Sequence, residues 1–395
     1  MTQPEVNLTR PLLALAFLAL ALLASAGTSF AAEPRARELG IPFAFGTPGK
    51  WNAITDVPGV EVGQQTLVEG KDVRTGVTVV LPRGRGDESR QSCLGGYFSL
   101  NGNGEMTGIH WVEESGLVEG PIAITNTNSV GVVRDAVISY AAKRWPPKSN
   151  DWSWTVWSLP IVAETWDGDL NDVYGMHVKP EHLFAAIDGA SPGPVAEGGV
   201  GGGTGMICYE FKGGIGTSSR VLDSKQGGYT VGVLVQANHG LRHQLRVAGI
   251  PVGLEIRDGL VRTQDSGSII IVVATDAPLL PHQVKRLARR AALGLARTGS
   301  VAGNGSGDIF IAFSTANAAA ASESRKVMAV EMLPNDQMGP LFEATVGATE
   351  EAIINALVAG RTMTGRGGNT VLGMPHDRVR EILKRHGMLG EPAGR

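Results

Sequence analysis

The sequence contains little of several features that mark common classes of protein. Two cysteines, Cys93 and Cys208, among 395 residues allow at most one disulfide, and two buried free thiols are an equal alternative. The formal net charge of −3 gives no basic surface of the kind that binds nucleic acid. After the N-terminal segment, no apolar run approaches the roughly 20 residues that a membrane-spanning helix needs. We therefore expect neither a nucleic-acid partner nor a membrane association.

Three short motifs that would indicate other chemistries each lack a necessary part. The Gly189–Gly193 segment has the letters of a serine-hydrolase nucleophile elbow, but Pro192 has no N–H to donate to an oxyanion. The glycine-rich stretch 198–205 lacks the Gly-Lys-Ser/Thr of a phosphate-binding loop, and indicates a mobile or tightly turned loop. His239 and His243 have helical spacing, but no third ligand accompanies them. The sequence therefore predicts no metal and no cofactor.

The N-terminal segment is typical of a secretory signal peptide. Arg10 precedes an apolar run from Leu12 to Ala24, and small residues follow that run. This pattern predicts that residues 1–31 are removed and that the protein is periplasmic or secreted. Residues 32–395 would then form a single domain.

Short apolar segments bounded by glycine alternate with helical segments along the rest of the chain. Glycine, 54 of 395 residues, clusters in turns rather than in a low-complexity tract. The expected strands are Gly76–Leu81, Pro121–Thr125, Tyr229–Gln236, Ser268–Ala274 and Ile309–Phe313. The expected helices are Val130–Lys143, Pro180–Ile187, Pro281–Arg297, Pro340–Val358 and His376–His386. The alternation predicts a layered α/β or α+β sandwich in one domain.

A serine directly precedes the most informative of these strands. Ser268 follows Gly267 and heads an apolar run that is typical of a fully buried strand. Cleavage of the Gly267–Ser268 bond would leave a free α-amine, which with a reference pKa of about 7.7–8.0 can act as a base near neutrality. One residue would then supply both nucleophile and base. The dipeptide is also compatible with an ordinary loop end before a core strand.

Four other polar residues lie where an apolar run begins or ends. Asn238 stands just past one expected strand, where its amide could donate to an oxyanion. Glu164 follows another apolar run and could hold a substrate ammonium. Ser306 and Asp308 precede a third, and could form a relay in which Asp308 orients Ser306 and Ser306 stabilises the nucleophile or its amine. Taken alone, each position is equally typical of a turn or a solvated strand end.

Longer motifs, spread in order over most of the mature chain, accompany these residues. They are Trp51–Val60, Asn128–Val133, Phe211–Arg220, Val233–Asn238, Ala274–Leu279 and Pro375–Arg378. Through them the chain resembles the family of L-aminopeptidase/D-amino acid esterases and β-peptidyl aminopeptidases, which are self-processing serine enzymes. The resemblance implies a four-layer αββα sandwich, similar to the N-terminal-nucleophile hydrolases in its layers but not in its connectivity. It also implies a homo-oligomer of processed heterodimers.

Position by position, the resemblance also implies the roles of the candidate site residues. Ser268 would be the nucleophile and Asn238 the oxyanion donor. Ser306 and Asp308 would be the activating pair, and Glu164 the anchor for the substrate amine. Some relatives carry glutamate at the position of Asp308, so the shorter side chain here could alter the geometry of the relay.

A second departure from the family concerns the substrate pocket. Trp166 stands where some relatives carry tyrosine, so a hydroxyl is absent and the pocket shape differs. If that segment is extended, Trp166 faces the same side as Glu164 and could form a wall of the pocket. A tryptophan of the core is the alternative.

Together these observations predict an exported aminopeptidase that cleaves itself into fragments 32–267 and 268–395, which remain associated. Its substrate would be a small peptide, amide or ester with a free amine, from which an acyl-enzyme on Ser268 releases the N-terminal residue, preferably a β-amino acid. One alternative is an L-α-aminopeptidase or D-alanine esterase and amidase. Another is a non-enzymatic periplasmic binding protein whose glycine-rich loops close on a ligand.

Overall fold

The computed structural model describes residues 34–86, 91–146, 159–318 and 327–392. The expected signal peptide, residues 1–31, lies outside the described residues. The chain from Pro34 to Arg395 forms one compact unit. Within the described ranges, no helix is long and apolar enough to cross a membrane.

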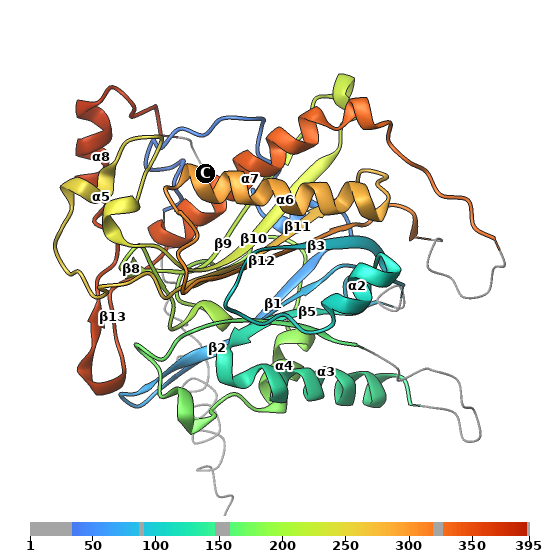
Figure 1. Ribbon diagram of the computed structural model, residues 1–395, viewed down its shortest axis with the longest axis horizontal. Coiled ribbons are helices and arrows are strands. Elements are labelled where there is room, and N and C mark those ends of the chain that lie inside the picture. The colour runs from blue at the N-terminus through green and yellow to red at the C-terminus, as the bar shows by residue number, and fades with distance from the viewer. Residues whose placement is uncertain (1–33, 87–90, 147–158, 319–326, 393–395) are drawn as a thin grey trace, which may run out of the picture. The chain divides into compact units, whose positions relative to one another are not determined.

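Two β-sheets face each other at the centre of this unit (Figure 1). The larger sheet has the strand order β4 (Leu117–Val118), β3 (Cys93–Gly102), β12 (Gly307–Ser314), β11 (Ser268–Thr275), β10 (Thr230–Asn238) and β9 (Gly214–Val221). The smaller sheet has the order β1 (Glu61–Glu69), β2 (Val73–Leu81), β5 (Ile122–Asn126) and β6 (Ile161–Thr165). The pairs β11–β12 and β5–β6 are parallel, and the other neighbours are antiparallel.

Helices cover the outer face of each sheet. Against the larger sheet pack α6 (Pro281–Arg297) and α7 (Gly339–Val358), and against the smaller sheet pack α3 (Val130–Arg144) and α4 (Pro180–Asp188) (Figure 1). The order of layers is therefore helix, sheet, sheet, helix, which confirms the expected αββα sandwich. The remaining helices are α2 (Ile109–Ser115), α5 (Val252–Glu255) and α8 (His376–Arg385).

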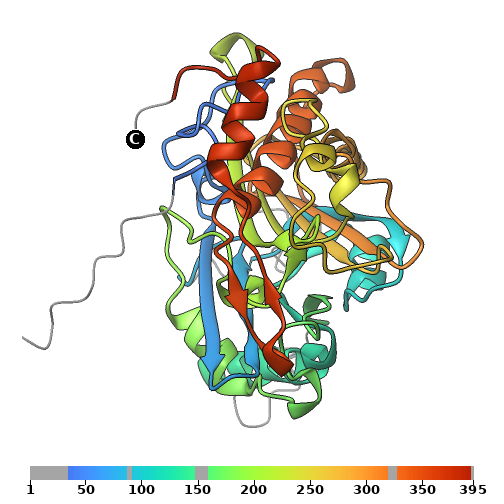
Figure 2. The same ribbon diagram turned by 90° about the vertical axis from the view of Figure 1, so that its left-hand side faces the viewer.

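Two short hairpins complete the description. They are β7 (Ile207–Cys208) with β8 (Phe211–Lys212), and β13 (Met363–Thr364) with β14 (Thr370–Val371). The β13–β14 hairpin and α8 lie together at one side of the unit (red in Figure 2). The β7–β8 hairpin lies against the end of β10, because the Tyr209 N–H in its turn donates to the His239 carbonyl at 2.7 Å.

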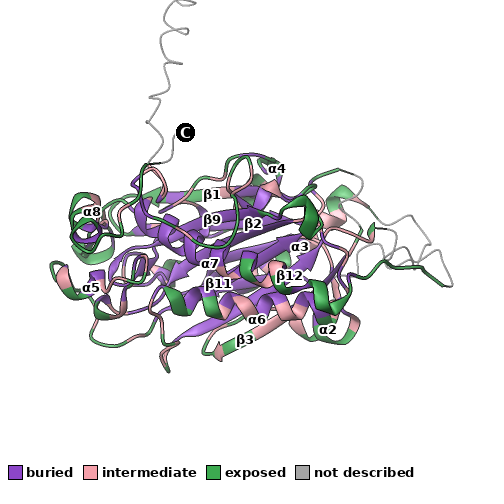
Figure 3. Cartoon of the chain, turned by 90° about the horizontal axis from the view of Figure 1, so that it is seen from above, coloured by how far each residue is buried: buried purple, intermediate pink, exposed green. Residues whose placement is uncertain are grey.

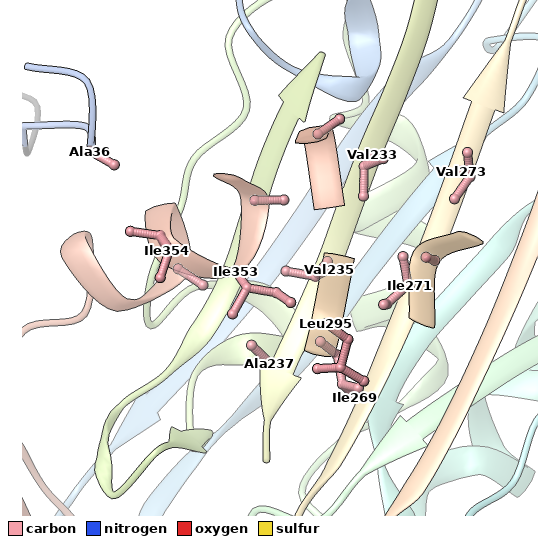
Figure 4. Packing of buried hydrophobic residues seen from close by; sticks show 14 of the residues in the cluster. Ala36, Val233, Val235, Ala237, Ile269, Ile271, Val273, Leu295, Ile353 and Ile354 are labelled. Atoms are coloured by element: carbon pink, nitrogen blue, oxygen red, sulfur yellow. The ribbon is translucent and has the colours of Figure 1, made fainter. Parts of the chain in front are cut away.

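The alternation of side chains along β11 explains how the sheets are held. Its odd-numbered side chains, such as Ile269 and Ile271, pack toward α6 and α7 in the cluster of Figure 4. Its even-numbered side chains, such as Ile270 and Val272, pack between the two sheets. Figure 3 shows the central strands fully buried below helices whose outer sides are exposed. Burial on both faces is why this strand is a continuous apolar run.

Every strand and helix expected from the sequence is present, with boundaries shifted by a few residues at most ends. The expected strands did not include β1, β3, β6 or β9. Strand β9 was missed because its polar residues are nevertheless buried. Arg220, for example, is fully buried and pairs with Glu351 of α7 at 2.8 Å. Ser218 donates to the side chain of Asn52 at 3.0 Å. Such distant partners leave no periodicity that sequence alone could detect.

The rejected motifs have the structures that their missing parts indicated. The segment Gly189–Gly193 follows helix α4 rather than a strand, so it forms no nucleophile elbow. The glycine-rich stretch is tightly turned: Gly201–Gly203 forms a buried 3₁₀ helix. A Cβ at Gly202 would lie 2.2 Å from Gln236 Oε1, so this turn has no room for side chains. Cys93 and Cys208 are both buried free thiols, which resolves the cysteine alternatives.

Candidate active site

Ser268 and Asn238 face each other across neighbouring strands. Asn238 ends β10 and Ser268 begins β11, and the antiparallel register pairs them directly. Both continue the set of positions that points between the sheets, which includes Leu234 and Ile270. Asn238 is fully buried and Ser268 is 5% exposed. The pair therefore lies in an environment of low dielectric, where a hydrogen bond to a developing charge is stronger than in water.

The Asn238 carboxamide is held at both ends. Its Oδ1 accepts the Ile207 N–H at 2.7 Å, and its Nδ2 donates to the Trp166 carbonyl at 2.8 Å. A carboxamide nitrogen carries two N–H donors, so one remains for a ligand. These contacts fix which end of the amide is the donor end.

The Ser268 hydroxyl has a main-chain partner on the next strand. The Gly307 N–H donates to Ser268 Oγ at 3.1 Å. Because β11 and β12 are parallel, their first residues lie together at one edge of the sheet. A Cβ at Gly307 would lie 2.5 Å from the Asn103 carbonyl oxygen and 2.6 Å from Gly104 Cα. Only glycine therefore fits at the position that places this donor.

Ser306 and Asp308 form the hydrogen bond that the sequence predicts. Ser306 Oγ donates to Asp308 Oδ1 at 2.6 Å, and both residues are buried. Asp308 Oδ2 has no hydrogen-bond partner among the described residues. Burial, assisted by the nearby charge of Asp265, raises the pKa of Asp308 to about 6 although the Ser306 hydroxyl opposes the rise. The contact between Ser306 and the nucleophile stays a prediction, because the bond that joins β12 to Ser268 here comes from Gly307.

Glu164 is the penultimate residue of β6 on the facing sheet and is 4% exposed. Its Oε1 accepts the Glu105 N–H at 3.0 Å, and its Oε2 accepts the Thr127 hydroxyl. Both partners are uncharged donors. Burial raises the pKa of Glu164 above its ordinary value. A buried carboxylate held only by neutral donors can stabilise an added cation strongly.

One residue of the loop after β3 connects the two sides of the candidate site. A Cβ at Gly104 would lie 3.1 Å from Gly307 Cα and 3.2 Å from Glu164 Oε1. Glu164 and Gly307, the main-chain donor to Ser268, therefore both lie close to Gly104. The structure thus brings the candidate amine anchor toward the candidate nucleophile from the opposite sheet.

Trp166 contributes to the site mainly through its main chain. Strand β6 ends at Thr165, so the alternation that would place Trp166 beside Glu164 does not continue through it. The half-buried indole turns back over Gly168, where a Cβ would lie 2.3 Å from Trp166 Cζ2. The Trp166 carbonyl is the acceptor that orients Asn238.

The residue before Ser268 is sterically restricted to glycine. A Cβ at Gly267 would lie 1.8 Å from the Asn238 carbonyl oxygen and 2.8 Å from His239 Cα. The Gly267–Ser268 peptide is thereby pressed against the end of β10. Sequence reasoning missed the contributions of Gly307 and Ile207, since main-chain donors leave no residue-type signal.

Comparisons with known proteins show the family to which the chain belongs. The sequence model of the family described as Peptidase family S58 matches residues 52–371 of this chain. The chain is 53% identical over 385 residues to beta-peptidyl aminopeptidase BapA of Sphingosinicella microcystinivorans, covering 91% of this chain and 94% of that protein. A structure of a Burkholderia sp. beta-aminopeptidase is 50% identical with a TM-score of 0.82, covering 90% and 99% of the two chains. The L-aminopeptidase D-Ala-esterase/amidase from Ochrobactrum anthropi, described as a new variant of the Ntn hydrolase fold, is 45% identical with a TM-score of 0.84, covering 91% and 100%.

Proposed function

Because this chain belongs to peptidase family S58 and is a hydrolase of the aminopeptidase type, we propose that it is a self-processing serine aminopeptidase that releases N-terminal β-amino acids. The observation that carries the proposal is the setting of Ser268 at the head of β11. Its hydroxyl meets the Gly307 N–H at 3.1 Å and lies in register with the Asn238 amide. The proposed nucleophile, a main-chain donor to its hydroxyl and the proposed oxyanion donor would thereby lie together at one buried edge of the sheet.

Self-cleavage would begin with attack of Ser268 Oγ on the carbonyl carbon of Gly267. The acyl group moves from the Ser268 nitrogen to Oγ, so the C–N bond breaks, an ester C–O bond forms, and the hydroxyl proton moves to the nitrogen. Water then hydrolyses the ester, which leaves a carboxylate on Gly267 and a free amine on Ser268. The steric restriction of residue 267 to glycine supports this step, because only a residue without a side chain allows the scissile peptide to lie against the end of β10.

The topology supports continued association of the fragments 32–267 and 268–395. Strands β11 and β12 belong to the smaller fragment, and they lie between β3 and β10 of the larger one. Separation would break two ladders of main-chain hydrogen bonds and expose both apolar faces of β11.

In turnover, the free amine of Ser268 would accept the hydroxyl proton while Oγ attacks the substrate carbonyl. Asn238 would donate to the tetrahedral oxyanion, and the amine would return the proton to the leaving group. Water would release the acyl group and restore the serine. The Ser268 ammonium would give the unpartnered Oδ2 of Asp308 a charged donor, and Ser306 would connect the two.

The substrate would need a free amine, because its ammonium group would pair with the buried carboxylate of Glu164, and a blocked amine would leave that carboxylate without a charged partner. A β-amino acid has one more methylene between its ammonium and its carbonyl than an α-amino acid has. The separation of Glu164 from Ser268 would therefore select between the two classes, by about 1–3 kcal/mol for one methylene. The two relatives named as β-aminopeptidases favour the β class. The Ochrobactrum relative supports the alternative, an L-α-aminopeptidase or D-alanine esterase and amidase.

Export and assembly are part of the same proposal. The N-terminal pattern supports removal of residues 1–31 and a periplasmic or secreted location. The family resemblance supports a homo-oligomer of processed heterodimers.

Denaturing gels and N-terminal sequencing test the self-cleavage. The purified protein should give two fragments, the smaller of which begins at Ser268, and Ser268→Ala should remain one chain. A different N-terminus, or cleavage of the alanine variant, would remove the nucleophile assignment.

The ratio of kcat/KM for β-alanyl and L-alanyl p-nitroanilides tests the substrate class. A preference of about tenfold or more for L-alanyl, within the range one methylene can provide, would support the α-aminopeptidase alternative instead.

A further inference from the structure

The segment that leads to the scissile bond is anchored in the turn of the β7–β8 hairpin. The Glu210 carboxylate accepts the N–H groups of Val261 and Arg262 at 2.8 and 2.9 Å. It also accepts the Arg242 N–H at 2.9 Å. Glu210 is 3% exposed, so these bonds are shielded from water. Residues 261 and 262 are thereby held a few positions before the bond that the proposed function cleaves.

The turn that makes this anchor is strained. Tyr209 and Glu210 have φ values of +48° and +59°, a region that costs a non-glycine residue on the order of 1–3 kcal/mol. The Arg242 side chain holds the turn, since it donates to both of these residues' carbonyls at 2.8 Å. Its guanidinium also stacks on the Phe211 ring at 3.3 Å. The buried arginine thus stabilises a strained turn, and this turn places the Glu210 carboxylate where it accepts the N–H groups of Val261 and Arg262.

From this anchor, the Arg262 side chain reaches the Asn238 amide. Its Nη2 lies 3.4 Å from Asn238 Oδ1, and its Nη1 lies 3.3 Å from the main-chain carbonyls of Asn238 and Ile207. The side chain is only 6% exposed. Its ion pair with Asp169, at 3.0 Å, involves a carboxylate whose side chain is 46% exposed. The buried contacts of Arg262 are therefore with the residues that carry and orient the candidate oxyanion donor.

We propose that Arg262 is a positioning residue for the reaction, which acts by holding and polarising the Asn238 amide. A guanidinium at the amide oxygen draws electron density from the nitrogen and makes the free N–H a stronger donor. It also opposes rotation of the amide that would present the oxygen to an oxyanion. This inference rests on the proposed function, because it assigns Asn238 the oxyanion.

A structural consequence follows for the processed enzyme. Both anchor points, at 261 and 262, precede the cut after Gly267. The C-terminal segment of the larger fragment would therefore remain a working part of the active site after cleavage.

The test is a double-mutant cycle between Arg262→Met and Asn238→Ala, with rates expressed per cleaved chain. Complete loss of one oxyanion donor costs about 10²–10³ in kcat, so loosening the donor through Arg262→Met should lower kcat about 10- to 100-fold with KM changed less than about threefold. In the Asn238→Ala background, Arg262→Met should cost less than about twofold, because its target is absent.

Arg378→Met is the matched control. Arg378 binds Asp258 at 2.7 Å, and thus holds the same segment at its far end, with a half-exposed side chain. This variant should change kcat less than about twofold, as expected for an exposed ion pair. A loss as large as that of Arg262→Met would mean that any loosening of the segment suffices, which would overturn a specific role for Arg262.

Losses from Arg262→Met and Asn238→Ala that multiply would also overturn the inference, as would an unchanged kcat in Arg262→Met. If thermal melting shows that Arg262→Met is unfolded, Arg262→Lys replaces it in the cycle. Lysine keeps the charge but not the fork, so a smaller loss with the same non-additivity is expected. Failure of the proposed function gives a different pattern, namely a wild-type protein that neither cleaves itself nor turns over substrate.

Discussion

Replacing Asp308 by asparagine should change how the stability of the uncleaved chain depends on pH. Asp308 is fully buried, and burial raises its pKa from the ordinary 3.8 to about 6. A rise of about two units corresponds to about 3 kcal/mol between the two protonation states. Because the folded chain holds this proton more tightly than the unfolded chain, the free energy of unfolding falls as pH rises between about 4 and about 6. Asparagine stays neutral and removes that fall.

The comparison is made in the Ser268→Ala background, so that every protein remains one chain. Urea unfolding followed by circular dichroism at pH 4 and pH 7.5 gives the free energy of unfolding for the parent and for Asp308→Asn. The stability of the variant relative to the parent should rise by about 2.4 kcal/mol between the two pH values, because a small part of the change already occurs below pH 4. Any cost of burying the new amide hydrogens is the same at both pH values and cancels.

Asp135→Asn is the control for this measurement, since the Asp135 side chain on α3 is 78% exposed. It should show no comparable rise. The reasoning would be refuted if the stability of Asp308→Asn relative to the parent were the same at both pH values. That result would mean that folding does not raise the pKa of Asp308.

Two further predictions concern turnover by the processed enzyme. Glu164→Gln should raise KM for free-amine substrates more than it lowers kcat, and N-acetylated substrates should fail with the wild type; equal kinetics for the two proteins would contradict the anchor role. Burial raises the pKa of Glu164, so its carboxylate should become protonated at a higher pH than that of an exposed glutamate. The wild-type KM, measured across pH, should therefore already rise at that higher pH as the pH falls. The glutamine variant should lack this rise. Ser306→Ala combined with Asp308→Ala should cost no more in kcat than the worse single variant, since a relay acts as one unit; losses that multiply would show that the two residues act independently.

The sequence predicted elements well where one physical signal dominates. Strand β11 was found because burial on both faces requires an unbroken apolar run. Helix α6 has the expected bounds because Pro281 begins it in the first turn, where the missing N–H has no cost. Strand β9 escaped detection because the partners that allow its polar residues to be buried lie far away in the sequence, such as Glu351 for Arg220.

The residues of the candidate site also differ in whether the sequence could predict them. Ser268, Asn238, Ser306 and Asp308 could be selected from the sequence because each stands at the end of an apolar run, and strand ends meet at the edges of sheets. Their assignment as catalytic residues stays a prediction. The position of Trp166 could not be derived, since its orientation depends on where β6 ends.

The sequence by itself determined the class of fold, several of its strands and its longest helices, and a short set of candidate residues for the site, because periodicity and side-chain chemistry are local properties. Only the tertiary structure decided which groups meet. It paired Asn238 with Ser268 through the register of β10 and β11, and it supplied the Gly307 N–H through the parallel β12. It also brought Arg262 to the Asn238 amide. These contacts depend on main-chain groups and on residues distant in sequence, whose encounter is fixed by strand register and packing rather than by any local pattern.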